Sequence, residues 1–177
     1  MAVYRDEDDI GHHDRIAQLI PRLRRYARAL TGERDAADDL VQDTLERALS
    51  RFHLWRRGSD LRAWLFTIMH NVYVNQLRSS RRHPLEPLAD GLAEDELRAR
   101  EPDWLELRDL EGALARLAPE QRAVVLLVGL EQFTYEEAAR VLGIPIGTVM
   151  SRLARGRERL RAILAGEAGV SVLKRVK

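Results

Sequence analysis

Apolar residues recur at intervals of three and four along most of the chain, whereas alternation with a period of two is scarce. This pattern predicts an all-α fold. A first helix is expected over residues 14–30, ending at Thr31-Gly32. A second helix starts near Asp35, and residues 61–82 predict a third helix with a basic C-terminal end.

The helix that starts near Asp35 has two contrasting faces. One is an apolar stripe, made of Ala37, Leu40, Val41, Thr44, Leu45, Ala48 and Leu49. The opposite face is polar and mostly acidic, with Asp38, Asp39, Gln42, Asp43 and Glu46. Asp35 is expected to cap the helix, with Asp38 in the first turn, where the helix dipole favours a carboxylate. On periodicity alone, the acidic face is simply solvated.

Between the two helical parts lies a segment without a sustained apolar stripe. Residues 83–103 contain three prolines and seven carboxylates, a composition typical of linkers. We therefore expect two small helical domains joined by an acidic flexible linker. The expected division is a disordered N-terminus over 1–13, a first domain over 14–83, the linker over 84–103, a second domain over 104–165 and a C-terminal tail over 166–177.

The second domain contains the punctuation of a helix-turn-helix. Thr134 and Glu137 have the spacing of a capping box, which begins a short helix. Gly143 suits the left-handed conformation that ends a helix, and Pro145 suits the first turn of the next one. Residues 134–160 therefore have the length and pattern of a unit whose second helix enters the major groove of DNA.

The second helix of this unit is rich in arginine. Helical periodicity turns four residues inward: Val149, Leu153, Gly156 and Leu160. It turns four others outward: Ser151, Ala154, Arg155 and Glu158. The candidates for phosphate and base contacts are Thr148, Met150, Ser151, Arg152, Arg155, Arg157 and Arg159. The alternative is a solvated basic helix with salt bridges such as Glu158 to Arg161.

The formal net charge of +1 conceals an uneven distribution. Residues 1–83 carry +3, residues 84–103 carry −5 and residues 104–177 carry +3. Such charge asymmetry indicates more about partners than the net value does. All but two of the 29 basic residues are arginine. Arginine suits bidentate contacts with phosphate or guanine, but its excess equally reflects a GC-rich genome.

Composition excludes several classes of function. The chain has no cysteine, which excludes disulfides, thiolate zinc sites and iron–sulfur clusters. No apolar run reaches the roughly 18 residues of a membrane span, and the N-terminus is acidic where a signal peptide is basic. The protein is therefore expected in the cytoplasm, without membrane insertion. A metal-dependent nuclease built on His12, His13 and Asp14 lacks a second ligand set, so we expect no metal, no cofactor and no enzymatic activity.

Two sequence blocks, in this order, resemble a known family. The first combines DAADDLVQDTLERAL with LRAWLFTIMHNVYVNQLRSSRR, and the second is LAPEQRAVVLLVGLEQFTYEEAARVLGIPIGTVMSRLARGRERL. Over residues 14–164 the chain resembles bacterial sigma factors of the extracytoplasmic-function (ECF) type. Its first block is similar to that of members that govern general stress responses.

The resemblance implies a specificity subunit of RNA polymerase and not a catalyst. A sigma region 2-like domain would bind core RNA polymerase and capture the −10 promoter element. A region 4-like domain, which contains the helix-turn-helix, would read the −35 element. The resemblance also implies an anti-sigma factor as a partner, besides core polymerase and promoter DNA.

The resemblance further implies roles for residues of the first domain. It places core-polymerase contacts on the acidic face, at Asp39, Gln42, Asp43 and Glu46. It places contacts with the unpaired −10 strand at Arg56, Arg57, Asn71, Asn75, Arg78, Arg81 and Arg82. Phe52 or Trp55 either stacks on a captured base or belongs to the core, to which Trp64 is assigned. The acidic linker either threads the polymerase channel or is an ordinary tether.

The chain departs from the family pattern at a few positions. Met150 stands where lysine or arginine is frequent, which leaves the −35 sequence open. Asn75 stands where aspartate is frequent, and Gly156 replaces the usual alanine, which should weaken the helix by up to about 1 kcal/mol. The rival interpretation is a free-standing helix-turn-helix regulator that acts as a dimer. It predicts a dimerisation element that does not stand out in the sequence, and it leaves residues 35–82 unexplained.

Overall fold

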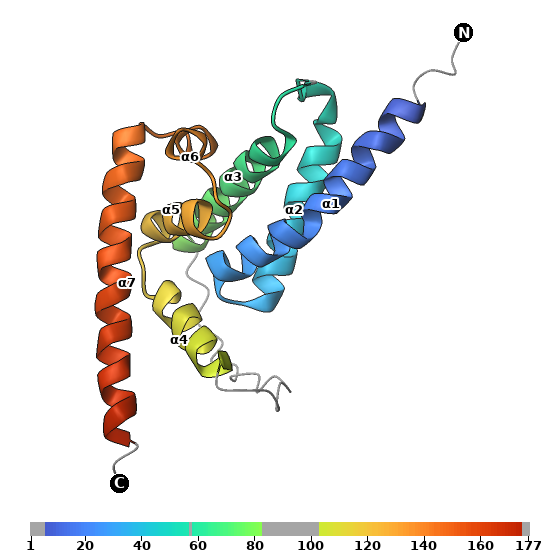
Figure 1. Cartoon of the computed structure of the whole chain (residues 1–177). Helices are drawn as coiled ribbons and strands as arrows, with labels where there is room; N and C mark the ends of the chain where they lie inside the picture. Colours follow the sequence, from blue (N-terminus) through green and yellow to red (C-terminus); the bar gives the residue numbers. More distant parts are fainter. Residues whose placement is uncertain (1–5, 57, 83–102, 175–177) are drawn as a thin grey trace.

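The computed structural model describes residues 6–56, 58–82 and 103–174, with side chains placed for 14–56, 58–79 and 109–166. This part of the chain forms seven α-helices and one short 3-10 helix, without a strand, as the all-α prediction requires. The elements are α1 (Asp6–Thr31), α2 (Arg34–Ser50), η1 (Phe52–Leu54), α3 (Leu61–Arg82), α4 (Asp103–Ala115), α5 (Pro119–Gly129), α6 (Tyr135–Leu142) and α7 (Ile146–Lys174). In Figure 1, α1–α3 form one group, and α5 and α6 lie between that group and α7. Nearly all of the expected linker lies outside the described residues.

The group α1–α3, here called the N-terminal half, has a core that draws on all three helices. The largest side chains that are fully buried there are Leu23, Tyr26, Leu30, Leu40, Leu65, Phe66, Met69 and Val72. The rings of Tyr26 and Phe66 meet edge to face, with 5.1 Å between their centroids. Burial raises the pKa of Tyr26, with smaller contributions from Tyr73 and Glu131, so that its hydroxyl stays neutral.

The apolar stripe predicted for α2 is confirmed over most of its length. Ala37, Leu40, Val41, Thr44 and Ala48 are buried, and Leu45 is half-buried. Leu49 was assigned to the stripe wrongly, because 48% of its surface is exposed. It is the last residue but one of α2, where the chain turns away into η1.

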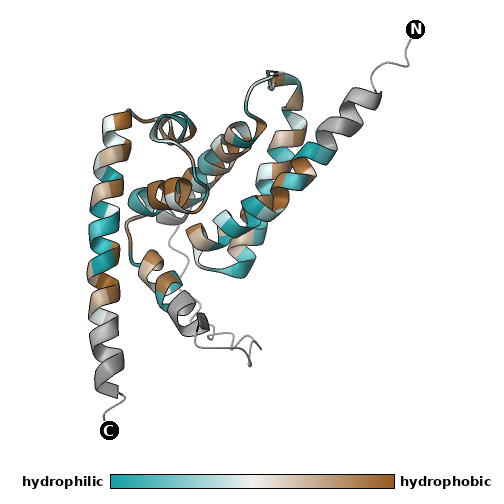
Figure 2. Ribbon diagram, in the orientation of Figure 1, coloured by the Kyte–Doolittle hydropathy of each residue, from teal (hydrophilic) through white to brown (hydrophobic). Residues whose placement is uncertain are grey.

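The helices α4–α7, here called the C-terminal half, are joined through α7, which contacts α4, α5 and α6. Figure 2 shows α5 coloured mostly as hydrophobic, whereas the middle of α7 is hydrophilic. The buried residues of α5 include Val124, Leu126 and Leu127, so this helix contributes much of the core of the C-terminal half. Val149 and Leu153 turn inward from α7, as its periodicity predicts. None of the described helices is both long and apolar enough to cross a membrane.

Helix boundaries differ from the prediction at three places. α1 begins at Asp6, so that part of the segment expected to be disordered is helical; an acidic sequence is favourable at a helix N-terminus. Glu33, not Asp35, occupies the N-cap of α2, without a side-chain cap, and Asp35 lies in the first turn. α7 continues to Lys174, through most of the expected C-terminal tail.

The two halves pack against each other. α1 contacts α4 and α5, and α3 contacts α6. The rings of Phe66 in α3 and Phe133 between α5 and α6 lie edge to face at 5.2 Å. The guanidinium of Arg122 in α5 donates a hydrogen bond of 2.8 Å to the carbonyl of Leu30 in α1. Periodicity predicts two separate helical domains and gives no sign of this interface.

Candidate nucleic-acid interface

Local hydrogen bonds build the helix-turn-helix in the way the sequence predicts. Thr134 Oγ1 accepts from the N–H of Glu137 at 3.2 Å, and Glu137 Oε2 accepts from the N–H of Thr134 at 2.8 Å. This backbone hydrogen bond from Thr134 lowers the pKa of the Glu137 carboxyl. Gly143 ends α6 in the left-handed region with φ of 64°, and Pro145 precedes the first residue of α7. The turn therefore fixes the angle at which α7 leaves α6.

The outer face of α7 presents most of the predicted DNA contacts. Met150, Ser151, Arg155, Arg157 and Arg159 are exposed, and 52% of the Met150 surface is open to solvent. Arg155 Nε donates to the carbonyl of Ser151 at 3.2 Å, and another of its nitrogens lies 3.4 Å from Ser151 Oγ. These bonds hold the Arg155 side chain along the helix, where a groove of DNA would meet it.

Two of the predicted contacts on α7 are less accessible. Thr148 and Arg152 are half-buried. Burial lowers the pKa of His70 in α3 to about 4, and the positive charge of Arg152 contributes to the same shift. His70 Nδ1 is buried and makes no hydrogen bond within the described part of the chain. The histidine is therefore neutral at physiological pH, and it lies close to the recognition helix.

The structure describes the side chains of some of the candidates for −10 contacts but not of others. Asn71, Asn75 and Arg78 are exposed on α3, and their spacing of four and three places them on one side of the helix. Arg56 is exposed in the loop before α3. Arg57 lies outside the described residues. Arg81 and Arg82 end α3, but their side chains are not placed.

The aromatic residues near this loop form a cluster. The rings of Phe52 and Trp55 stack with 5.4 Å between their centroids, and Phe52 meets Trp64 edge to face at 6.0 Å. Only 5% of the Trp55 surface is exposed, and the Arg15 guanidinium lies 5.6 Å from its ring centre. Trp55 therefore belongs to the core, whereas Phe52 and Trp64 are half-buried at its edge.

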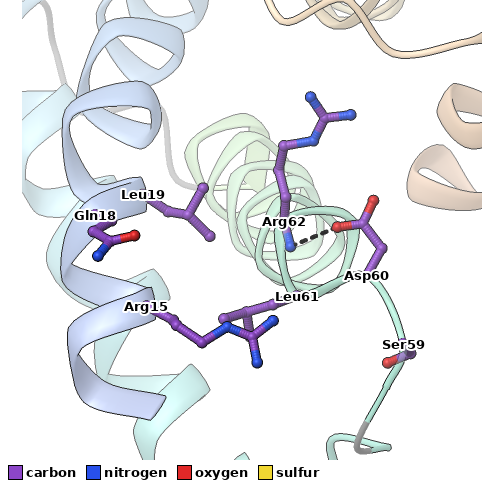
Figure 3. Close-up of a pocket in the computed structure, with 7 residues that line it drawn as sticks. All are labelled: Arg15, Gln18, Leu19, Ser59, Asp60, Leu61 and Arg62. Atoms are coloured by element: carbon purple, nitrogen blue, oxygen red, sulfur yellow. Dashed lines mark hydrogen bonds between the residues drawn. The ribbon is translucent and has the colours of Figure 1, made fainter. Parts of the chain in front are cut away.

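An open hollow of about 270 Å³ lies between the N-terminal part of α1 and the start of α3 (Figure 3). Its lining comprises Arg15, Gln18, Leu19, Ser59, Asp60, Leu61 and Arg62. Asp60 Oδ1 accepts from the N–H groups of Arg62 and Ala63 at 2.9 and 3.2 Å, which caps α3. The hollow thus combines polar groups with the apolar side chains of Leu19 and Leu61, beside the loop that precedes α3.

The acidic face of α2 is exposed at Asp39, Gln42 and Glu46. Gln42 Nε2 donates to Glu46 Oε1 at 3.1 Å. Asp43 differs, because it is half-buried and its Oδ2 accepts from Gln76 Nε2 of α3 at 3.1 Å. Asp43 therefore joins α2 to α3 as well as bordering the acidic face.

Sequence reasoning missed the charged residues between the two halves. Arg22, Arg25 and Arg62 of the N-terminal half converge on Glu131 of the C-terminal half. The one available signal was a carboxylate at the end of the largely apolar stretch AVVLLVGLEQF. A lone glutamate at a helix end is ordinarily solvated, so this signal alone does not predict a buried ion pair.

Comparison with known families divides the chain as the two blocks do. Residues 16–70 match the family described as the Sigma2 domain of PhyR, and residues 107–160 match Sigma-70, region 4.

Two curated relatives cover most of the chain. The ECF RNA polymerase sigma factor EcfG of Rhodopseudomonas palustris is 40% identical over 153 residues, which cover 85% of this chain and 83% of the relative. The ECF RNA polymerase sigma factor SigE of Mycolicibacterium smegmatis is 34% identical over 157 residues, or 85% of this chain and 60% of that one.

Two solved structures share the arrangement of helices. The sigma factor RpoE from Bartonella quintana, in complex with the anti-sigma factor NepR, superposes with a TM-score of 0.75 and 35% identity over 88% of this chain and 97% of that one. CnrH, in complex with the cytosolic domain of CnrY, superposes with a TM-score of 0.64 and 27% identity over 87% of each chain.

Proposed function

This chain belongs to the family of ECF RNA polymerase sigma factors. We propose that it binds core RNA polymerase and directs transcription initiation at promoters whose −10 and −35 elements it recognises. The observation that carries the proposal is the outer face of α7, which presents an arginine-rich surface on a capped helix-turn-helix. The free-standing regulator accounts for this unit alone. It gives the body made by α2 and α3 no role.

The α7 face would read the −35 element. Arg155, held by Ser151, is placed to meet a base edge such as guanine, and the exposed Met150 offers an apolar contact for a thymine methyl group. Arg157 and Arg159 would contact phosphates, which fix the register without reading the sequence. We therefore expect base specificity to come chiefly from the first three turns of α7.

The exposed side of α3 would handle the −10 element. Asn71 and Asn75 can donate to and accept from base edges, and Arg78 can meet the backbone of the unpaired strand. The hollow between α1 and the start of α3 is the place we assign to a base that has left the stack. Its polar lining suits hydrogen bonds to the base edge, and Leu19 and Leu61 supply apolar contact.

The acidic face of α2 would dock on the polymerase. Asp39, Gln42 and Glu46 are exposed, so they can meet cations on a partner without rearrangement of α2. Asp43 is a poorer probe of docking, since its substitution would also remove the hydrogen bond from Gln76.

An anti-sigma factor is the further partner that we propose. RpoE of Bartonella quintana, in its complex with NepR, has the same fold over nearly the whole of its length. We infer that a protein of the same kind binds this chain while its two halves lie together.

The function is tested by reconstitution. Tagged protein is incubated with purified core RNA polymerase, and run-off transcription is measured on genomic fragments. We expect co-purification with core and discrete new transcripts. Arg155→Ala should still bind core but lower transcription by about 5- to 150-fold, the range for loss of one bidentate base contact. Arg140→Ala removes the same charge from α6, outside the proposed DNA face, and should leave transcription unchanged.

A second variant tests the docking face. The double substitution Asp39→Ala with Gln42→Ala should weaken co-purification with core while duplex DNA binding by the isolated protein persists. Equal transcription by Arg155→Ala from promoters with an intact and a scrambled −35 element would contradict the role of α7. Failure of the unsubstituted protein to bind core, together with binding to duplex DNA, would favour the free-standing regulator.

A further inference from the structure

One buried carboxylate joins the two halves of the molecule. The side chain of Glu131, which follows α5, is 0% exposed. Arg22 Nε of α1 donates to its Oε2 at 2.9 Å, and Arg25 of the same helix donates to its Oε1 at 2.8 Å. Both oxygens of the carboxylate are therefore paired with cations of the other half.

The main chain at this point is held as well. Arg22 donates a second hydrogen bond, of 3.1 Å, to the carbonyl of Glu131, and Arg62 of α3 donates one of 3.3 Å to the same oxygen. The Arg62 guanidinium also lies 4.0 Å from the centre of the Phe133 ring. Gln132, the next residue along, has φ of 58°, a conformation uncommon for residues other than glycine. We call Glu131, Arg22, Arg25 and Arg62 the Glu131 cluster.

The Glu131 cluster serves the contact between halves more than the fold of either half. Each hydrogen bond to the Glu131 carboxylate in the described part of the chain comes from α1, more than 100 residues away in sequence. If the halves separate, the carboxylate and the arginines pass into water, where each is well solvated. The ion pairs thus stabilise the contact between the halves, and their loss leaves no buried charge within either separated half.

The closed arrangement does not match the spacing of a promoter. α3 and α7 both pack against α6, and packed helices lie 8–10 Å apart, so the two proposed reading helices are within about 20 Å of each other. Elements named −35 and −10 are centred about 25 base pairs apart, which is about 85 Å at 3.4 Å per step. The halves must separate for both elements to be bound at once. The 20 residues 83–102 can span up to about 70 Å between the end of α3 and the start of α4, and the lengths of the two halves add to the distance between the reading helices.

We propose that the Glu131 cluster is a latch that holds this sigma factor closed and unable to span a promoter until the halves part. The proposal rests on the proposed binding of one promoter element by each half. Substitution of the arginines destabilises one state and not the other. In the closed state it leaves a buried carboxylate unpaired, whereas in the open state water solvates the carboxylate. Such substitutions therefore shift the balance towards the open state.

The test measures the distance between the halves in the full chain. Because the chain has no cysteine, S50C on α2 and A162C on α7 can be labelled without background, and both positions are exposed. The distance distribution is recorded without DNA or polymerase. Unsubstituted protein should give one short distance. R22A with R25A should lower the closed-to-open ratio at least tenfold. R24A with R28A removes two exposed arginines of the same helix outside the cluster and should keep the short distance.

The helical content of every variant is measured by circular dichroism first. If R22A with R25A loses helix, E131Q decides in its place, because it removes the charge at nearly constant size and should also open the chain. A long distance in the unsubstituted protein, or a short one in the deciding variant, would overturn the latch. The deciding variant should also reach half-maximal transcription at a several-fold lower concentration. An opened chain without that gain would overturn the regulatory role, whereas absence of transcription from every form, including the unsubstituted one, would contradict the proposed function instead.

Discussion

At the scale of single residues, Arg122 shows how one buried cation can bind the C-terminal ends of two helices. It is only 9% exposed. Its guanidinium donates to the carbonyls of Leu30, Ala115 and Leu117, near the C-terminal ends of α1 and α4. Carbonyls in the last turn of a helix lack partners within the helix and favour a nearby cation. Arg122 therefore satisfies main-chain groups from both halves at once.

Arg122→Ala should lower the free energy of unfolding by about 3 kcal/mol or more, because it leaves buried carbonyls without donors that carry charge. The measurement is urea denaturation followed by circular dichroism. Arg140→Ala, at an exposed position of α6, should change the same quantity by less than about 0.5 kcal/mol. Equal midpoints for the two variants would mean that water satisfies these carbonyls as well as Arg122 does.

Residues of this kind could not be predicted from the sequence. The partners of Arg122 are main-chain oxygens, which carry no sequence signal, and those of the Glu131 carboxylate lie more than 100 residues away. In contrast, Thr134 and Glu137 were predicted correctly because the capping box is complete within four residues. Local chemistry is legible in a sequence, and distant pairing is not.

At the scale of elements, periodicity predicted which face of a helix is buried better than where the helix ends. Val149, Leu153 and Gly156 are buried on α7 as expected. Leu49 has the same apolar character, but it lies at the end of α2 and is exposed. A period of 3.6 residues gives the direction of a side chain. It does not show whether a neighbouring helix extends far enough to cover it.

Gly156 reverses the expectation based on helix propensity. A Cβ at this position would lie 2.8 Å from Cγ2 of Val125 and 3.5 Å from Cβ of Gln121, both on α5. Valine has essentially one χ1 rotamer in a helix and cannot easily move aside. The glycine therefore allows α7 to approach α5 closely, and its cost to the isolated helix is offset by that packing.

Gly156→Ala should accordingly destabilise the protein, by about 1 kcal/mol net, since overpacking of 1–3 kcal/mol exceeds the gain in helix propensity of up to about 1 kcal/mol. Gly112→Ala in α4, where nothing lies within 4 Å of the new Cβ, should be neutral or stabilising. Both are compared by urea denaturation. A more stable Gly156→Ala variant would show that α7 can shift away from α5 without a cost in stability.

At the scale of the whole molecule, the sequence predicted the two helical bodies but not the way in which they pack together. The two helical bodies, the helix-turn-helix and its exposed arginines follow from local signals and from family resemblance. Their packing depends on the fit between surfaces that are distant in the chain, such as the rings of Phe66 and Phe133. No periodicity within either body encodes that fit.

Because the halves share buried polar contacts, the unsubstituted protein should unfold as one cooperative unit. Calorimetry should give a single transition whose calorimetric and van't Hoff enthalpies agree. R22A with R25A should divide it into two transitions, one for each half, whereas R24A with R28A should not. A single transition in the R22A with R25A protein would mean that Phe133 and Arg122 suffice to couple the halves.

The Glu131 carboxylate also determines how the protein meets a polyanion. In the closed chain it neutralises the guanidinium groups of Arg22 and Arg25, while Arg62 is held beside them by the main-chain carbonyl of Glu131. Once it is withdrawn, these cations are free to pair with DNA phosphates. Each phosphate that an arginine neutralises releases cations condensed on the DNA, and that release favours binding. Opening would thus give the promoter a patch of positive charge that the closed protein withholds, so that the duplex itself would favour the extended form.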